Sequence, residues 1–530
     1  MTSRNNEAPS TQRKSTFNEL GLKGTIEALS EEIRELYASD DVPWIIGYSG
    51  GKDSTATLQL IWTAVAGLPV EQRKKTIHVI STDTLVENPV VAAWVTHSLE
   101  AMGAAATKQE LPIKPHRLTP RVEESFWVNL IGRGYPAPRH KFRWCTERLK
   151  IKPSNRFILN VVKASGEAIL VLGSRKAESS RRSANMTKHE RRRVRDRLSP
   201  NAGLPGTLVY TPIEEWTNDD VWMFLTQCAN PWGYNNADLL GMYAGASADG
   251  ECPLVVDTST PSCGDSRFGC WVCTLVEKDK SMSAMIHNDA EKEWMLPLLT
   301  LRNKLDFRPK EKNEASQTFV APSKTAEGDI EKEEHNGDRH LRDFRRMSGA
   351  IQTMKDGRVI PGPYLQSARE DWLRELLKAQ TWIRQHGPDD VRSIELITLD
   401  ELQEIRRIWV VDKHEMEDFL PRIYEEVTGD KYPGPRLDDS MAIHAKDLAL
   451  LKETCGDDIL HYELTRELLG VTRQGRASQR RAGHYERLEK TFGKHYYDTP
   501  EEAVSYAKKR DHRRSVFKGA KVAEGEEASS

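Results

Sequence analysis

A six-residue loop, residues 49–54, carries the first side chains whose types and order suggest chemistry. It reads Ser-Gly-Gly-Lys-Asp-Ser and follows the short apolar run 43–48, which is typical of a buried strand. Paired glycines let the backbone turn with its N–H groups exposed, and the N-terminus of a following helix adds a positive dipole. Such a loop binds an anion such as pyrophosphate, with Lys52 as a point charge and Asp53 as a possible Mg²⁺ ligand. The alternative is a tight turn that binds nothing.

The loop differs from a Walker A loop, because Asp53 stands where that loop needs Ser or Thr after the lysine. We predict that Lys52 and Asp53 are catalytic residues, and we assign the whole loop to nucleotide binding: Ser49, Gly50, Gly51, Lys52, Asp53 and Ser54.

Polar residues also follow two later apolar runs that are typical of strands. Asp83 ends the run 75–83, while Gly173, Arg175 and Arg182 follow the run 168–172. Guanidinium groups at a strand end suit the clamping of phosphate. We therefore predict that these four residues bind the cofactor, with solvated surface arginines as the alternative for Arg175 and Arg182.

The cysteines form the second group with chemical potential. The chain has 7 cysteines, an odd number, and four of them fall within 22 positions. A C-x-x-C pair places two thiolates on one turn, and two more complete a cage for Zn²⁺ or an iron–sulfur cluster. Spacing alone does not distinguish these metals. The predicted ligands are Cys252, Cys263, Cys270 and Cys273.

Cys145 lies apart from this group, in a basic stretch with Arg143, Arg148 and Lys150. Neighbouring positive charge lowers a thiol pKa, so Cys145 is a candidate catalytic residue that could carry a persulfide. Two alternatives are that Cys145 is a cluster ligand in place of Cys252 or Cys263, and that it is buried and inert. Cys228 and Cys455 lie in mainly apolar helical stretches, and we expect them to be structural.

The elements that must position these residues alternate along the chain. Apolar runs at 43–48, 75–83 and 168–173 are separated by stretches with helical spacing, such as 54–65. Alternating strands and helices imply βαβ units and a parallel sheet, with ligands at the carboxyl ends of the strands. The fold class is therefore α/β, followed by a Cys-rich segment and a helical C-terminal region.

Composition shifts suggest the domain boundaries. We expect a flexible tail at 1–20, the α/β domain at 20–245, the four-Cys segment at 246–280, a charged insertion at 281–360, a helical region at 361–515 and a disordered tail at 516–530.

The overall charge excludes a uniformly basic nucleic-acid coat, since 77 Lys and Arg stand against 79 Asp and Glu. Two runs are nevertheless locally basic: residues 181–197 have a net charge of +6, and residues 470–494 a net charge of +5. Each could bind DNA phosphates, and each could instead be a solvated helix face or a surface for an acidic partner protein. No apolar stretch is long enough to span a bilayer and the start lacks an apolar signal core, so we expect a cytoplasmic protein that makes no contact with a membrane.

The loop S-G-G-K-D-S resembles that of the PP-loop ATP pyrophosphatase superfamily. Three further stretches resemble its phosphoadenosine-phosphosulfate reductase branch: G-S-R-K-A-E-S-S-R-R (173–182), P-I-E-E-W-T-N-D-D-V-W (212–222) and R-W-C-T-E-R-L-K (143–150). This resemblance covers residues 40–275. It implies cleavage of ATP between the α and β phosphates. It also favours a [4Fe–4S] cluster over zinc, although only Cys145 stands where the branch has a Cys pair.

The chain further resembles the Dnd C family, the sulfurtransferases of bacterial DNA phosphorothioation, over residues 20–380. The supports are the loop, S-T-D-T-L-V-E-N-P (81–89), the four-Cys segment and the long C-terminal extension. This resemblance implies that ATP adenylates a non-bridging oxygen of the DNA backbone, which sulfur from a cysteine desulfurase then replaces. The implied partners are DNA, the desulfurase and other Dnd-type modification proteins.

Two other classes remain. A small-molecule reductase of the same branch would share the loop but would be about half as long, with a redox cysteine near its C-terminus. A non-catalytic DNA-binding scaffold would explain the basic runs but not the loop together with the clustered cysteines.

Overall fold

A computed structural model describes residues 14–195, 197–247, 268–307, 337–354, 356–435, 445–476, 483–495 and 497–527. Contacts between Cα atoms divide the chain into two compact units. The first, the α/β unit, comprises Met1–Arg121 and His140–Leu299. The second, the helical unit, comprises Val122–Arg139 and Thr300–Ser530.

The α/β unit is built on a six-stranded sheet with the order β3-β2-β1-β4-β6-β5. All neighbouring strands are parallel except the short edge strand β5, which pairs antiparallel with β6. This sheet confirms the predicted α/β class. The strands are β1 (Trp44–Gly47), β2 (Ile77–Thr82), β3 (Ile113–Leu118), β4 (Ala168–Val171), β5 (Ser199–Pro200) and β6 (Thr207–Tyr210).

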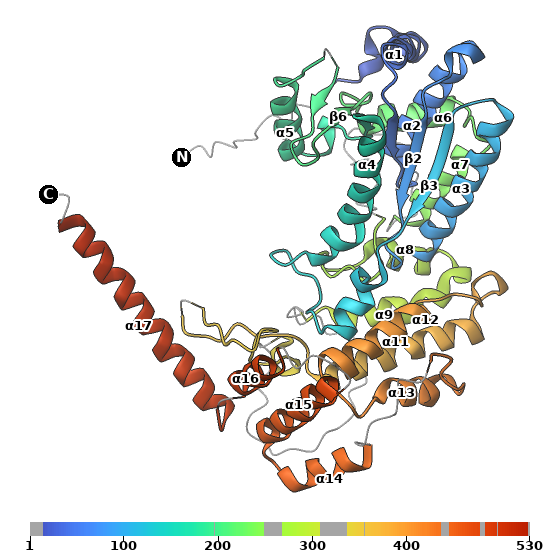
Figure 1. Cartoon of the computed structure of the whole chain (residues 1–530). Coiled ribbons are helices and arrows are strands. Elements are labelled where there is room, and N and C mark those ends of the chain that lie inside the picture. The colour runs from blue at the N-terminus through green and yellow to red at the C-terminus, as the bar shows by residue number, and fades with distance from the viewer. Residues whose placement is uncertain are drawn as a thin grey trace, which may run out of the picture. The chain divides into compact units, whose positions relative to one another are not determined.

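Side-chain alternation explains how the sheet is covered on both faces. In β1, Trp44 and Ile46 join a core with the helices of one face, while Ile45 joins a second core on the other face. The first face carries α1 (Gly21–Ala38), α2 (Lys52–Ala66), α3 (Pro89–Lys108), α6 (Asn218–Gln227) and α7 (Asn236–Gly245) (Figure 1). The second core is smaller and includes Ile158 of α4 (Lys152–Ser165).

Three strands were missing from the sequence prediction. β3 contains Lys114, Pro115, His116 and Arg117, so it lacks the apolar run that marks β1. Pro115 lies on an edge strand, where a missing N–H is tolerated. The strands β5 and β6 are too short, at 2 and 4 residues, to show a clear period.

Residues 15–17 differ from the flexible tail that we expected. Ser15 donates a hydrogen bond to Asp220 at 2.5 Å, and Phe17 packs edge-on against Trp216 at 5.3 Å. Two specific contacts therefore anchor residues 15–17, within the stretch 1–20 that we expected to be flexible.

The helical unit confirms the predicted helical C-terminal region. Its helices include α11 (Gln366–His386), α12 (Leu399–Arg407), α13 (Phe419–Thr428), α14 (Ala445–Cys455), α15 (Ile459–Arg476), α16 (His484–Lys494) and α17 (Pro500–Glu527) (Figure 1).

Two parts of the expected layout differ from the structure. Residues 281–305, within the expected charged insertion, form α8 (Lys280–Asn288), η7 (Ala290–Met295) and α9 (Leu296–Leu305), because apolar residues such as Met282 and Leu298 recur and are buried. Residues 516–527, expected to be a disordered tail, continue α17, since Ala, Glu and Lys favour helix.

A short segment inserted in the sequence of the α/β unit belongs to the core of the helical unit. Residues 122–139 follow β3 and contain η4 (Val128–Gly132). The Trp127 indole donates to the Leu396 carbonyl at 2.8 Å, and the Trp409 indole donates to the Ile131 carbonyl at 3.0 Å. Both indoles are fully buried, so this segment is part of the packing of the helical unit.

None of the helices that the structure describes combines the length and the apolar character needed to cross a bilayer.

Candidate active site

The loop between β1 and α2 has the backbone conformation that its glycines allow. Gly50 has a φ of +73°, which L side chains rarely adopt. A Cβ atom there would also lie 2.5 Å from Val95 Cγ2, too close for any side chain. Gly51 precedes the first residue of α2, so the loop runs directly onto a helix N-terminus. This is the strand–glycine–helix arrangement that the sequence predicted.

Hydrogen bonds join the two serines of the loop. The Ser49 N–H donates to Ser54 Oγ at 3.1 Å, and Ser54 Oγ donates to the Gly51 carbonyl at 2.9 Å. Ser54 is buried. Ser54 therefore stabilises the shape of the loop from within.

A cavity of about 790 Å³ lies beside this loop, at the carboxyl ends of β1 and β2. Ser49 to Lys52 and Asp83 form its polar wall, and Ile80, Ile158 and Leu170 are among its apolar lining. Its volume falls within the 300–1,000 Å³ that is usual for small-molecule sites. A glycine cradle, a helix N-terminus and an apolar wall together fit ATP, with its phosphates at the loop.

Lys52 and Asp53 lie at the start of α2, where they form part of a charge network. Lys52 Nζ is 3.7 Å from Asp53 Oδ2 and 5.3 Å from the ring centroid of Tyr243. Arg175 Nε donates to Asp53 Oδ1 at 2.7 Å, and its other end donates to the Trp216 carbonyl at 3.2 Å. Arg175 is only 3% exposed, so it positions Asp53 and does not line the cavity.

This arrangement does not suit Asp53 as a Mg²⁺ ligand. Each of its two carboxylate oxygens already contacts a cation, Arg175 or Lys52. Asp83 is engaged in the same way, because Arg117 binds one of its oxygens and the Leu85 N–H donates to the other at 2.8 Å. Magnesium binding by Asp53 stays a prediction, and no step is assigned to that ion.

Gly173 and Arg182 lie outside the lining of the cavity. A Cβ atom on Gly173 would lie 2.7 Å from the Asp53 carbonyl, so this glycine lets β4 end against α2. Arg182 is exposed and forms an ion pair with Glu178, one turn earlier. Of the three residues predicted after β4, Arg175 is the one that contacts the phosphate loop.

The C-x-x-C turn contacts the segment that follows β2. A bridge joins Cys270 to Glu87, and the Trp271 N–H donates to the Val86 carbonyl at 3.0 Å. Cys270 Sγ lies 3.3 Å from Thr84 Oγ1. Glu87, which lines the ATP-sized cavity, thus also contacts the thiol segment.

Cys145 lies near this turn, close enough to interact electrostatically with Cys273. Burial raises the pKa of the Cys145 thiol, with Arg143 opposing the shift only weakly, which corrects the prediction of a lowered pKa. Burial likewise raises the pKa of Cys270 to about 12. Lys150 forms an ion pair with Glu87 at 3.3 Å and also lies near Cys270 and Cys273.

The structure therefore places three thiols, those of Cys145, Cys270 and Cys273, in one neighbourhood, although their sulfur atoms do not all lie within 4.8 Å of one another. Thiolate is the ligand of both zinc and iron–sulfur clusters, so this donor set fits such a group and Cys145 fits it as a ligand. Cys252 and Cys263 lie outside the described residues. Cys228 is the C-cap residue of α6 and Cys455 is the last residue of α14, and both are partly buried.

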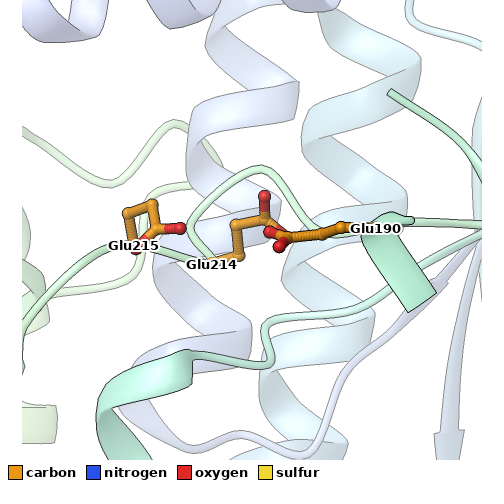
Figure 2. Close-up of side chains that lie close together, drawn as sticks. All are labelled: Glu190, Glu214 and Glu215. Carbon is orange, nitrogen blue, oxygen red and sulfur yellow. The ribbon is translucent and has the colours of Figure 1, made fainter. Parts of the chain in front are cut away.

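Four of the eight cations in the basic run 181–197 form ion pairs, namely Arg182, Arg193, Arg195 and Arg197. Figure 2 shows Glu190, Glu214 and Glu215 close together beside this run, and their ligand atoms lie within 4.8 Å of one another. Lys176 forms ion pairs with Glu190 and Glu215, and Arg193 pairs with Glu214 at 2.8 Å. These cations satisfy the three carboxylates, so we assign no metal to them. Arg480 and Arg481 of the second run lie outside the described residues.

Comparison with known proteins shows what this part of the chain is similar to. Residues 43–232 match the family model of the phosphoadenosine phosphosulfate reductase domain. This part of the chain is a reductase-type PP-loop domain. An uncharacterized protein of Methanocaldococcus jannaschii is 26% identical over 200 residues, which are 38% of this chain and 35% of that protein. The match thus spans about a third of that relative.

Two solved structures are similar to the reductase-type domain. One is the phosphoadenylyl-sulfate reductase of Candida auris in a phosphate complex, with a TM-score of 0.26 and 14% identity over 43% of this chain and 95% of that chain. The other is the U34-tRNA thiolase NcsA of Methanococcus maripaludis with its [4Fe-4S] cluster, with a TM-score of 0.26 and 14% identity over 42% of this chain and 72% of that chain.

Sequence reasoning missed several residues of the site. Tyr243 accepts a hydrogen bond from the Lys52 N–H at 3.3 Å, Arg117 holds Asp83, and Glu87 joins the cavity to the thiols. Glu87 lies in the quoted stretch 81–89, so the resemblance pointed to it. Tyr243 and Arg117 had no local signal, because only the fold brings them to the loop.

Proposed function

We propose that the chain is an ATP-dependent sulfurtransferase that activates a DNA backbone phosphate for phosphorothioation. The observation that carries the proposal is the shared wall of one cavity. It runs from the phosphate loop at Ser49–Lys52 to Glu87 and Lys150, which lie beside the clustered thiols. An ATP-cleaving site next to a sulfur-carrying or metal-holding site is what an enzyme of this kind needs.

In the first step, a non-bridging phosphodiester oxygen attacks the α-phosphorus of ATP, and pyrophosphate leaves. The helix N-terminus and Lys52 are placed to stabilise the negative charge that develops on the departing phosphates. Arg175 fixes Asp53 and, with it, the position of Lys52 3.7 Å away. Adenylation is required because a phosphate oxygen is a poor leaving group, while AMP is a good one.

In the second step, sulfur replaces the activated oxygen and AMP leaves. If a persulfide on Cys145 supplies the sulfur, its terminal sulfur bonds to phosphorus as the bond to AMP breaks. A second thiol then attacks the S–S bond, which leaves a disulfide for an external thiol to reduce. A cysteine desulfurase would reload the sulfur.

Cys145, Cys270 and Cys273 would instead hold a [4Fe–4S] cluster, with zinc as the alternative, if they act as ligands. Such a cluster, when bound, supplies a place for electrons or sulfide. The burial of Cys145 and its raised pKa count against a free nucleophilic thiolate at this position.

DNA contact in this proposal falls on the cations of α5 (Ser180–Glu190) and the residues just after it. Arg181, Lys188, Arg191 and Arg192 are exposed, and none forms an ion pair with a carboxylate in the described part of the chain. Other Dnd-type proteins would be the remaining partners.

The decisive experiment supplies ATP, a cysteine desulfurase with cysteine, a reducing thiol and duplex DNA to the anaerobically purified protein. We expect release of pyrophosphate and AMP and the appearance of phosphorothioate-linked dinucleotides by mass spectrometry. The Lys52→Ala protein is the control. Sulfide or sulfite production from a small sulfur compound, without modified DNA, would favour the small-molecule reductase instead.

A further inference from the structure

A second cavity, of about 820 Å³, lies within the helical unit. The helices α11, α13, α14 and α15 line it, together with residues 343–349 and the loop that follows η10 (Ile408–Asp412) (Figure 1). Its volume is within the range of small-molecule sites. The reductase-type domain and the proposed function leave this cavity without a role.

The carboxylates of this cavity all have basic partners, with Arg345 shared between two of them. Each of the seven that line it lies within 4.0 Å of a basic side chain. The pairs are Asp343 and Glu463 with Arg345, Glu370 with Arg374, Asp412 with Arg407, Glu415 with Arg369, Glu417 with Arg466, and Glu467 with Lys494. His495 also contacts Glu467, at 3.0 Å.

Several cations of the lining remain without such a partner. Among the described residues, no carboxylate forms an ion pair with Arg133, Arg346, Lys413, Arg422 or Lys452. Arg133 Nε is buried and has no hydrogen-bond acceptor within the described part of the chain. The guanidinium of Arg346 donates to the Pro361 carbonyl at 2.7 Å, and Arg422 lies over the ring of Phe419. The cavity thus has a surplus of positive charge.

Lys413 is the most constrained of these cations. Burial lowers its pKa to about 8, and the nearby charge of Arg369 lowers it further. Glu415 and Asp343 also lie near Lys413, but each forms its ion pair with an arginine, Arg369 or Arg345. A buried ammonium group with no ion pair of its own in the described part of the chain is a place where an anion gains more than it would in water. The planar guanidinium of Arg133 adds N–H donors whose geometry suits phosphate oxygens.

The cavity also has an apolar side. Leu365, Ile408, Phe419, Leu448 and Ile459 line it together with the ring of Tyr462. Aromatic and aliphatic walls beside a few cations are typical of sites that bind a ligand with an anionic end and a flat apolar end. From the surplus charge, the volume and this wall, we infer that the cavity binds a phosphorylated, nucleotide-sized molecule.

A free nucleotide and the phosphate backbone of DNA share this chemistry. The free nucleotide fits better, because Arg133 lies deep enough for its Nε to be buried, and an exposed backbone phosphate of a duplex contacts surface cations instead. The inference does not depend on the proposed function of the reductase-type domain.

The test uses ADP and the full-length Lys52→Ala protein, in which the phosphate loop is weakened. Isothermal titration is expected to give one ADP site per chain. Adding Arg133→Met and Lys413→Met should lower the affinity at least tenfold. The matched control is Lys378→Met with Arg392→Met, two exposed cations of the helical unit outside this cavity, which should leave the affinity unchanged.

Four results would overturn the inference. In the first, the Lys52→Ala protein does not bind ADP, and in the second the Arg133→Met/Lys413→Met variant and its control bind ADP with equal affinity. In the third, inorganic phosphate binds as tightly as ADP. In the fourth, the Arg133→Met/Lys413→Met variant loses affinity for a 12-nucleotide single strand but not for ADP. The last result would identify a nucleic-acid site.

A second readout avoids substitution and any fault in folding. Reductive methylation of the wild-type chain at pH 7, followed by mass spectrometry, measures the reactivity of single lysines. ADP should protect Lys413 and leave Lys378 unaffected, with Lys52 reporting occupancy of the phosphate loop. Equal labelling of Lys413 with and without ADP would contradict the inference.

Discussion

Arg175 Nε lies 2.7 Å from Asp53 Oδ1, so a buried guanidinium at the end of β4 holds the second residue of the helix that begins at the phosphate loop. Arg175 is 122 positions from Asp53 in the sequence. The same guanidinium also donates to the Trp216 carbonyl, so three separate segments meet at this ion pair.

The first prediction concerns this pair. Arg175→Met leaves the Asp53 carboxylate without its buried partner, and breaking such a pair costs about 3–5 kcal/mol. We expect Arg175→Met to lower both the unfolding free energy and the rate of pyrophosphate release. The Arg175→Met/Asp53→Asn protein should recover stability but not activity. Additive losses of stability in the double-mutant cycle would contradict a direct interaction.

The second prediction concerns the loop itself. Lys52→Ala and Asp53→Ala should each reduce pyrophosphate release from ATP by an amount that corresponds to about 2–4 kcal/mol, because Lys52 supplies positive charge at the phosphates and Asp53 holds Lys52 in position. Lys114→Ala, an exposed lysine on β3, is the matched control. Release at the wild-type rate by both loop variants would remove the assignment of the loop to ATP.

The third prediction concerns the thiols. Cys145→Ser, Cys270→Ser and Cys273→Ser should each lower the iron content and bleach a broad visible absorption of the anaerobically purified protein. Each should also lower stability, since metal binding is coupled to folding. Cys228→Ser and Cys455→Ser are the controls. A colourless wild-type protein with one zinc and no iron would exclude the cluster, and full iron in Cys145→Ser would exclude Cys145 as a ligand.

The fourth prediction separates free from paired arginines near α5. Reversing Arg191 and Arg192 to Glu should weaken DNA binding at low salt and flatten the dependence of log affinity on log salt by about 0.9 per lost contact. Arg195 and Arg197 are paired with acidic side chains, at 2.9 Å to Asp40 and 3.2 Å to Glu35.

Reversing Arg195 and Arg197 should therefore destabilise the fold more and change the salt dependence less. An unchanged slope for Arg191→Glu/Arg192→Glu would exclude direct contact by these side chains. Failure of that variant to co-purify with the desulfurase, at normal DNA affinity, would indicate an acidic protein partner.

The fifth prediction is a pH dependence. Lys413 faces Arg369, Lys494, Glu415 and Asp343, and burial lowers its pKa from 10.5 to about 8. A lysine whose pKa is lowered on folding destabilises the folded state at pH values below its folded pKa. This destabilisation disappears as the pH rises to the unfolded pKa. Lys413→Met should thus raise the unfolding free energy at pH 7, by on the order of 3 kcal/mol, and by almost nothing at pH 10.5. Denaturation with urea measures both, and an equal gain at the two pH values would contradict a lowered pKa.

The elements that carry the phosphate loop could be predicted from local sequence. The run at 44–47 places apolar side chains on both faces of the sheet, and the glycine pair that follows it is typical of an anion-binding loop. The helical region after residue 361 followed from its periodic apolar residues, such as Leu373, Leu376, Leu377 and Ile383 of α11.

The edge of the sheet and much of the site could not be predicted in this way. His116 and Arg117 make β3 look like a polar loop, although backbone pairing with β2 places Arg117 opposite Ser81, two residues from the Asp83 that it binds. The roles of Arg175 and Cys145 depend on burial, which residue type and spacing do not reveal. Neighbouring charges suggested a lowered Cys145 pKa, and desolvation outweighs them.

The segment 122–139 has a consequence for how this protein can be divided. Because it is packed into the helical unit by Trp127 and Trp409, the backbone passes between the two units three times, after Arg121, Arg139 and Leu299. A truncation after residue 299 would leave the Trp127 indole and its apolar neighbours exposed to water. The same segment connects the strand that carries Arg117 to the stretch that carries Cys145, so local melting of the helical core would loosen the ends of both. An intact isolated reductase-type domain would therefore require replacement of residues 122–139 by a short polar linker.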